Sequence, residues 1–172
     1  MESRILVGYS SKYGATAEIA EKIGEALRQS GLQVDVLPVK NVKDLTPYNA
    51  FIVGSALYMF QWRADAMSFL KNYWKILAER PTWIFSSGPM GKGDPAEQVK
   101  DQSFQKKLEP VLAQIKPRGV TVFHGALNMN KLNFLERAIM KKMPDQQGDS
   151  RDWNMINAWA KQIAAELTKQ GK

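Results

Sequence analysis

The segment from Gly8 to Ile23, GYSSKYGATAEIAEKI, places hydroxyl residues around Gly14, between an apolar run and a helical pattern. These residues are Ser10, Ser11, Tyr13 and Thr16. The first amides of a helix lack partners within it, and the helix dipole adds partial positive charge there. We therefore expect this turn to bind one phosphate group, with Lys12 as a countercharge. The alternative is ordinary capping of the helix by Ser11 or Thr16.

Two common nucleotide-binding motifs are absent from this turn. A P-loop requires Lys and then Ser or Thr after its last glycine, whereas Gly14 is followed by Ala15. A dinucleotide site requires G-x-G-x-x-G and an acidic residue on the second strand, whereas Gly8 is followed by Tyr9-Ser10 and that strand ends in PVK. A mononucleotide with one terminal phosphate remains.

Two further segments carry residues suited to a flat ligand. SALYMFQWRAD (55–65) holds large apolar and aromatic residues that could stack on a planar ring, or that begin the next helix and face the core. SSGPMGKGD (86–94) has three glycines within six residues, which lets backbone groups face a ligand edge. Lys92 would place positive charge near such a ring, although a solvated lysine in a surface turn is the more common case.

The elements that position these segments alternate along the chain. Apolar runs predict strands at 4–9, 50–55, 82–87 and 119–127, and an alternating pattern predicts another at 32–39. Helical periodicity predicts helices at 15–30, 64–77, 95–115, 133–143 and from about Ser150 onward. This order predicts one α/β domain over residues 1–172, with a parallel sheet between two helical layers. Such sheets bind ligands at the carboxyl ends of their strands, where strand order reverses, so we expect the three segments to meet there.

Composition limits the chemistry. The chain has 172 residues, of which 44% are hydrophobic and 24% charged, and no cysteine, which excludes disulfides, thiolate metal sites and cysteine nucleophiles. We expect no metal site. The longest apolar stretch, at 50–60, is too short to span a membrane, and no signal peptide is visible, so we expect a cytoplasmic protein. The net charge of +7 favours phosphate ligands and anionic partners or lipid, and we expect no nucleic-acid partner.

The combination of SSKYGAT after the first strand, the aromatic segment and the Gly-rich segment resembles flavodoxins. This resemblance implies a doubly wound five-stranded sheet of order 2-1-3-4-5 that binds FMN. Within that family, FHGALNMNKLNFLERAIMKKM followed by GDSRDWNMINAWAKQIA is similar to the menaquinone-dependent protoporphyrinogen oxidases.

The resemblance also implies a set of cofactor-binding residues. The FMN phosphate would be held by Ser11, Lys12, Tyr13, Gly14, Ala15 and Thr16. One side of the isoalloxazine would be lined by Ser55, Ala56, Leu57 and Tyr58, and the other by Ser87, Gly88, Pro89, Met90, Gly91 and Gly93. Two departures stand out: electron-carrier flavodoxins tend to be acidic, and Tyr13 replaces a small hydroxyl residue.

Three functions fit these residues. The first is an FMN-dependent oxidoreductase that acts on a porphyrinogen and passes electrons to a quinone. The second is an FMN electron carrier without a substrate of its own. The third is a regulatory module that binds no flavin. No protein nucleophile is needed if FMN is bound, because the cofactor carries the redox chemistry, and no catalytic residue is assigned.

Three other features have two interpretations each. His124 is either a proton donor or, as is more common, a hydrogen-bonded structural histidine. Asp65 and Asp94 are either site carboxylates or helix caps. The helix at 133–143 has an apolar face beside Lys131, Arg137, Lys141 and Lys142. It either lies on an anionic membrane surface or, in the usual arrangement, packs on the sheet with its basic face in solvent.

Overall fold

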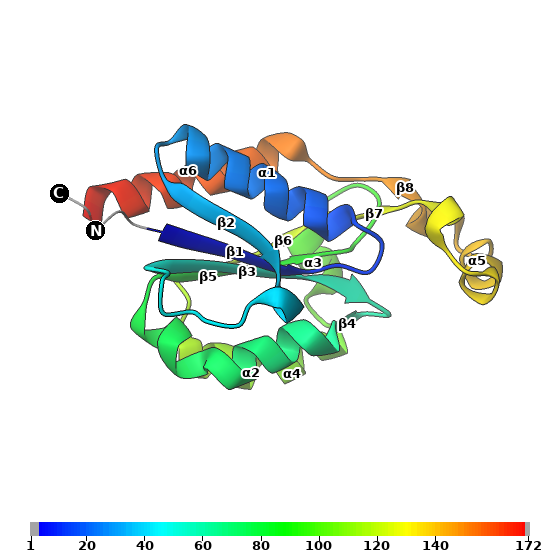
Figure 1. The fold of residues 1–172 in the computed structure, drawn as a ribbon. Helices are drawn as coiled ribbons and strands as arrows, with labels where there is room; N and C mark the ends of the chain where they lie inside the picture. Colours follow the sequence, from blue (N-terminus) through cyan, green and yellow to red (C-terminus); the bar gives the residue numbers. More distant parts are fainter. Residues whose placement is uncertain (1–3, 171–172) are drawn as a thin grey trace.

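The computed structural model describes residues 4–170 and contains a central parallel sheet (Figure 1). Its strands are β1 (Arg4–Ser10), β2 (Gln33–Pro38), β3 (Ala50–Tyr58), β5 (Thr82–Ser87) and β6 (Gly119–Phe123), in the order β2-β1-β3-β5-β6. Counting only these five strands, the order is the predicted 2-1-3-4-5. The chain places β2 on one side of β1 and β3 with the later strands on the other side. The switch point of the sheet therefore lies at the carboxyl ends of the neighbouring strands β1 and β3.

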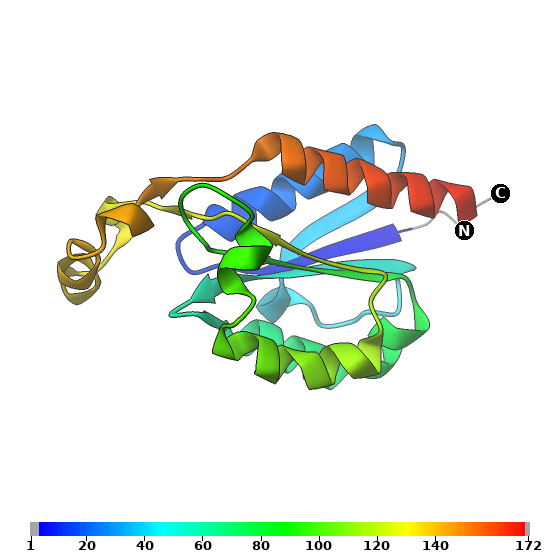
Figure 2. The ribbon, with the colours of Figure 1, turned by 180° about the vertical axis from the view of Figure 1, so that it is seen from behind.

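Helices cover both faces of this sheet (Figures 1 and 2). α1 (Ala15–Gln29) and α6 (Trp153–Gln170) pack side by side on one face, and α2 (Ala64–Glu79) and α4 (Ser103–Ile115) pack on the other. The 3-10 turn η1 (Val39–Asn41) follows β2, and the short helix α3 (Pro95–Val99) lies between β5 and α4 in the chain. The predicted three-layer α/β/α architecture is confirmed.

The core has two parts because successive residues of a strand point to opposite faces of the sheet. Leu6, Val53 and Ile84 lie in the cluster under α2 and α4. Ile5, Ile52 and Phe85 lie in the cluster under α1 and α6. Since the central strands are buried on both faces, they read in the sequence as continuous apolar runs, which is why their positions were predictable.

The region after β3 differs from the prediction. The strand does not end at Ser55 but continues to Tyr58 and pairs antiparallel with β4 (Gln61–Trp62), so the predicted loop is a tight hairpin. Met59 and Phe60 form its turn with φ values of 49° and 57°. Such turns usually carry Asn-Gly, and the absence of that signal hid the hairpin.

Two other predicted elements are interrupted. The helix expected at 95–115 is divided into α3 and α4, with Gln102 preceding the first residue of α4. The strand expected at 119–127 leaves the sheet after Phe123, because the amide of Gly125 donates to the carbonyl of Pro89 at 3.0 Å. A Cβ at Gly125 would lie 2.9 Å from Cα of Gly88, so these two backbones pack directly against each other.

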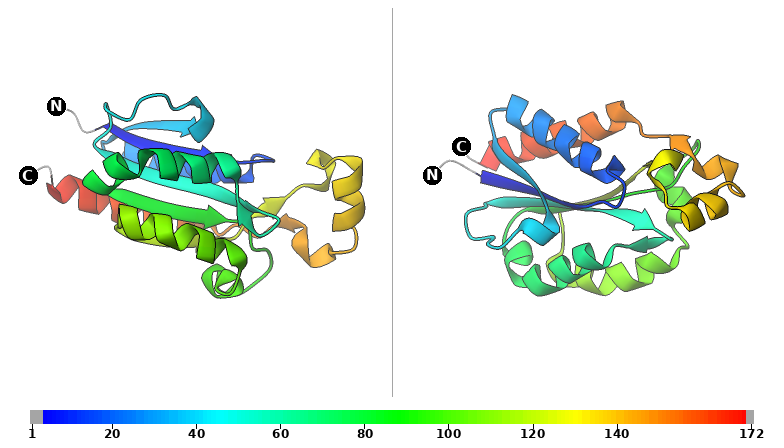
Figure 3. Two further views of the ribbon diagram at one scale, coloured as in Figure 1. Left: turned by 90° about the horizontal axis from the view of Figure 1, so that it is seen from below. Right: turned by 45° about the vertical axis from the view of Figure 1, so that its right-hand side comes forward.

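Residues 126–149 form an excursion that projects from the carboxyl end of the sheet (Figure 3). Its two arms pair as β7 (Ala126–Leu127) and β8 (Gly148–Asp149), and between them lie η2 (Met129–Lys131), α5 (Phe134–Met140) and η3 (Pro144–Gln146). α5 begins with a capping box formed by Asn133 and Glu136. The expectation that this helix packs on the sheet is wrong, because its apolar side chains are exposed.

Candidate functional site

The turn between β1 and α1 is open toward the carboxyl edge of the sheet. Gly14 is the N-cap of α1, with φ at 96°, and no side chain caps this helix. Ser11 does not cap the helix: its Oγ accepts a 3.0 Å hydrogen bond from the Gly14 amide inside the turn. The capping interpretation of Ser11 and Thr16 is therefore wrong, and the first-turn amides keep their capacity to bind an anion.

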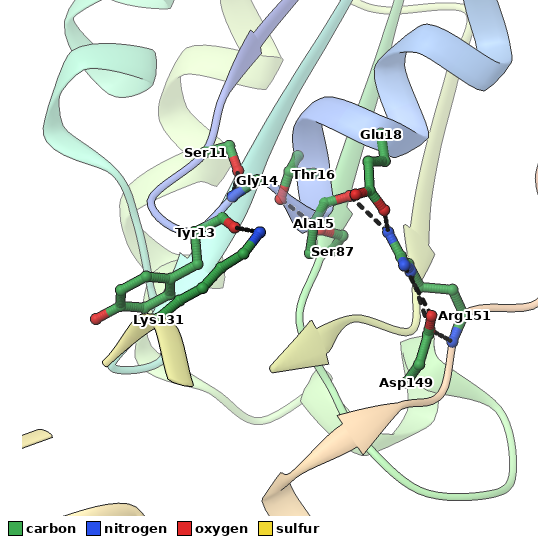
Figure 4. Close-up of polar contacts among 10 residues, drawn as sticks. All are labelled: Ser11, Tyr13, Gly14, Ala15, Thr16, Glu18, Ser87, Lys131, Asp149 and Arg151. Carbon is green, nitrogen blue, oxygen red and sulfur yellow. Dashed lines mark hydrogen bonds and ion pairs between the residues drawn. The ribbon is translucent and has the colours of Figure 1, made fainter. Parts of the chain in front are cut away.

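Two cations from distant parts of the chain contact this turn (Figure 4). Lys131 Nζ donates to the carbonyl oxygen of Tyr13 at 2.9 Å and would lie 3.4 Å from a Cβ at Gly14. Arg151 donates to the carbonyl oxygen of Ala15 at 3.2 Å and to the Glu18 carboxylate at 2.5 Å, while Asp149 also pairs with it at 2.7 Å. The carbonyls on either side of Gly14 are thus both held by cations from the excursion or its end.

Sequence reasoning missed this role of Lys131 and Arg151. Lys131 appeared only as part of a basic helix face, and Arg151 gave no signal at all. Both contacts join residues more than 100 positions apart, so no local pattern could have revealed them.

Lys12, the predicted countercharge, is turned toward the excursion instead. Its ammonium pairs with the Glu136 carboxylate at 2.5 Å and lies 3.7 Å from the ring centroid of Tyr58. Tyr58 also donates to the same carboxylate oxygen at 3.0 Å. These hydrogen bonds, that from Lys12 foremost, lower the pKa of Glu136 to about 2. This cluster fastens α5 to both the β1–α1 turn and the end of β3.

Tyr13 lies beside this cluster with its ring 6.4 Å from that of Tyr58. Its hydroxyl is buried beside the Glu136 carboxylate and the Lys12 ammonium. Burial raises the pKa of Tyr13 to about 12, so the neutral phenol is the form present at ordinary pH. Tyr13 thus belongs to the cluster of Lys12, Tyr58 and Glu136 at the mouth of this turn.

Other predicted hydroxyls hold the strand ends together rather than face outward. Thr16 Oγ1 and Ser87 Oγ are buried and lie 2.8 Å apart. Ser55 Oγ is fully buried, accepts from the amide of Arg63 at 3.1 Å and donates to the carbonyl of Ala56. Ser10 donates to Asp65 at 2.5 Å. These bonds join the ends of β1, β3 and β5 to α1 and to the start of α2.

The end of β3 and the Gly-rich segment meet directly. A Cβ at Gly88 would lie 2.8 Å from Cβ of Leu57, so only glycine allows this approach. Ala56 and Leu57 are half-buried, and Met90 is buried. The amide of Gly91 donates to Ser150 at 2.9 Å, which ties the segment to the base of α6. Lys92 is exposed.

A groove of about 460 Å³ lies between the β1–α1 turn and the excursion. Tyr13 and Ala15 line it from the predicted set, together with Lys131 and Arg151. Residues 55–58 and 87–93 are outside this lining, so the groove reaches two of the predicted phosphate residues and none of the predicted ring residues. Among residues 4–170 no cluster of His, Asp or Glu is arranged to hold a metal ion.

The remaining candidates are placed as follows. Asp94 is a helix cap, since its side chain accepts from the amide of Ala96 at the start of α3. Asp65 lies in the first turn of α2 and accepts from Ser10. His124 is buried at the end of β6, and within the described part of the chain its Nε2 has no hydrogen-bond partner.

Comparison with known proteins agrees with this geometry. Residues 6–154 match the flavodoxin domain, which is most of the chain. The chain belongs to the flavodoxin-domain family. Members of this family bind flavin and act in electron transfer, and the chain is accordingly a flavin-binding redox protein of that fold.

Individual proteins give further context. The chain is 23% identical to protoporphyrinogen IX dehydrogenase [quinone] of Escherichia coli K12, over 94% of each chain. A flavodoxin from the domain Archaea superposes with a TM-score of 0.58 at 15% identity, covering 96% of this chain and 99% of that one. A Streptococcus pneumoniae flavodoxin superposes with a TM-score of 0.60 at 19% identity, covering 95% and 99%. No helix within residues 4–170 combines the length and apolar character needed to cross a bilayer.

Proposed function

We propose that this chain binds FMN with its phosphate at the β1–α1 turn. The observation that carries the proposal is the uncapped start of α1 at the sheet's switch point, where Gly14 leaves room for close approach. Ser11, whose oxygen already accepts from Gly14, keeps its own proton to donate to a phosphate oxygen. Of the predicted phosphate residues, Ser11, Tyr13, Gly14 and Ala15 keep this proposed role, and Thr16 acts indirectly through Ser87.

Lys131 takes the place proposed for Lys12 as the cation of this site. Its ammonium is already at the turn, bound to one carbonyl, and two protons remain for a phosphate. Lys12 is engaged by Glu136 and instead holds the tyrosine pair in position. Arg151 orients the Ala15 carbonyl and thereby the first turn of α1.

The ring of the cofactor would lie between the end of β3 and the Gly-rich segment, as the resemblance implied. Leu57 and Tyr58 offer apolar and aromatic surface on one side, and the backbone of the Gly-rich segment would line the other, with the Gly91 amide already bound to Ser150. Ser55 and Ser87 are buried and would contribute by setting the backbone positions. When bound, FMN supplies the redox chemistry, and the protein positions it and excludes water.

We propose further that the chain is an oxidoreductase of the protoporphyrinogen dehydrogenase kind, with a quinone as electron acceptor. The support is the full-length alignment with the Escherichia coli enzyme, together with the excursion, whose Lys131 and Glu136 reach the cofactor turn. The alternative, an electron carrier without its own substrate, is favoured by the structural likeness to flavodoxins.

One experiment separates these two functions. Purified protein loaded with FMN is mixed with protoporphyrinogen under anaerobic conditions, with a menaquinone analogue or with buffer, and porphyrin fluorescence is followed. An oxidoreductase of this kind forms porphyrin in a quinone-dependent manner. A carrier forms none, yet its flavin is still reduced by a chemical reductant and reoxidised by a redox partner.

A further inference from the structure

The tip of the excursion exposes large apolar side chains that nothing in the described chain covers. Phe134 is 85% exposed, Leu135 71% and Ile139 50%, and Met143 beside them is also exposed. All four belong to α5 or the residues just after it, at the far end of the projection (Figure 3). Isolated exposed apolar residues are common on protein surfaces, but such a cluster marks an interaction surface.

The same tip is positively charged. Lys141 and Lys142 follow α5, are exposed and form no ion pair among residues 4–170. Arg137 donates only to backbone carbonyls, those of Met129 and Leu132. Of the three carboxylates on the excursion, those of Glu136 and Asp149 are neutralised by Lys12 and Arg151. Asp145 is exposed and forms no ion pair among residues 4–170, but Arg137, Lys141 and Lys142 outnumber it. The surface that surrounds the apolar cluster is therefore cationic.

We infer that the tip of the excursion docks on an anionic phospholipid surface, with Phe134, Leu135 and Ile139 inserted and Lys141 and Lys142 at the headgroups. Apolar side chains bordered by lysine are the features of a helix that lies in the membrane interface. The shape also favours lipid over a protein partner. The apolar residues of the tip come from a helix of only seven residues, whereas a stable protein interface takes roughly 800 Å² from each partner.

Docking at the tip would also hold the cofactor turn near the membrane. Lys131 and Glu136 fasten the excursion to that turn, so the tip and the cofactor turn are held together. Lipid binding itself does not depend on the proposed flavin and can be tested without it.

The test measures co-sedimentation with vesicles of phosphatidylglycerol mixed with phosphatidylcholine, and with vesicles of phosphatidylcholine alone. The wild-type chain is expected to bind the anionic vesicles and to be released by salt. Phe134→Gln with Leu135→Gln should weaken binding about a hundredfold through lost apolar burial. Lys141→Gln with Lys142→Gln should weaken it roughly thirty-fold, since each basic residue near an anionic surface contributes about fivefold.

Matched controls lie elsewhere on the surface. Lys106→Gln with Lys107→Gln removes another exposed adjacent pair, from α4, and Val120→Gln removes an exposed apolar residue from β6. Both should bind vesicles like the wild type. FMN titration of every variant should be unchanged, so that a failure of docking is distinguished from a failure of flavin binding.

The inference is overturned if the wild type ignores anionic vesicles, or if the tip and control variants bind them equally. It is also overturned if the wild type is a dimer in solution that Phe134→Gln with Leu135→Gln converts to a monomer, because a second copy then covers the tip.

Discussion

Lys131 Nζ donates a 2.9 Å hydrogen bond to the carbonyl oxygen of Tyr13, although 118 positions separate the two residues. The contact brings a cation from the excursion onto the turn that precedes α1. It adds a charge that the helix terminus and its hydroxyls do not provide, and it makes the excursion part of the candidate site.

Replacing this lysine should selectively weaken phosphate recognition. We expect Lys131→Met to reduce FMN affinity ten- to hundredfold, because a hydrogen bond to a charged group contributes about 1.5–3 kcal/mol. Riboflavin, which lacks the phosphate, should bind the variant and the wild type equally. Fluorescence titration with both flavins measures this, with Lys142→Met as the control. An equal loss for both flavins would assign Lys131 a purely structural role.

The conformation of Gly14 can be tested against a glycine with the same backbone requirement. Gly14→Ala and Gly31→Ala both place a Cβ at a positive φ, 96° and 82°, and should each lower the free energy of unfolding by about 1 kcal/mol. Only Gly14→Ala introduces a methyl group beside Lys131 and the phosphate position, whereas nothing lies within 4 Å at Gly31. FMN binding should therefore fall only in Gly14→Ala. Equal FMN affinity in the two variants would place the phosphate elsewhere.

The link between Lys12 and Glu136 predicts a pH dependence. The pKa of Glu136 is lowered from 4.5 to about 2, so its ion pair stabilises the attachment of α5 above pH 4.5. This contribution is lost as the pH falls from 4.5 toward 2. Carboxyl NMR should find Glu136 titrating near pH 2 in the wild type and closer to 4.5 in Lys12→Met. Titration near 4.5 in the wild type would mean that the attachment does not form in solution.

The hairpin turn at the end of β3 is predicted to be strained. Met59 and Phe60 both have positive φ, which costs bulky residues about 1–2 kcal/mol each. We expect Met59→Asn with Phe60→Gly to raise the free energy of unfolding by about 1–2 kcal/mol in urea, and to weaken FMN binding by removing apolar surface near the ring position.

Lys116→Gly serves as the control for this strain. Lys116 also has a positive φ, at the end of α4 and away from the site. Its replacement should stabilise the fold and leave FMN affinity unchanged. A hairpin variant less stable than the wild type would contradict the proposed strain.

The comparison with the sequence prediction separates local from long-range information. The central strands were predictable because burial on both faces leaves a continuous apolar run, as at Arg4–Ser10 and Thr82–Ser87. The edge strand Gln33–Pro38 is only partly buried and was indicated by its alternating pattern. The β3–β4 hairpin was not, because Met59-Phe60 lacks the usual turn residues. Periodicity revealed that α5 is amphipathic, but periodicity says nothing of what covers the apolar face.

The candidate site shows the same difference between local and long-range information. The turn around Gly14 was evident from its residue types and its place after the first strand. The roles of its side chains were not, since Thr16 bonds Ser87, Lys12 pairs with Glu136, and Lys131 supplies the cation. Each of these contacts depends on how distant segments pack.

The most direct measurement is calorimetric titration of the flavin-free protein with FMN and, separately, with riboflavin. The account predicts saturable binding of FMN at one site per chain, with clearly weaker binding of riboflavin. Absence of saturable FMN binding, or equal affinity for the two flavins, would contradict a phosphate site at the start of α1.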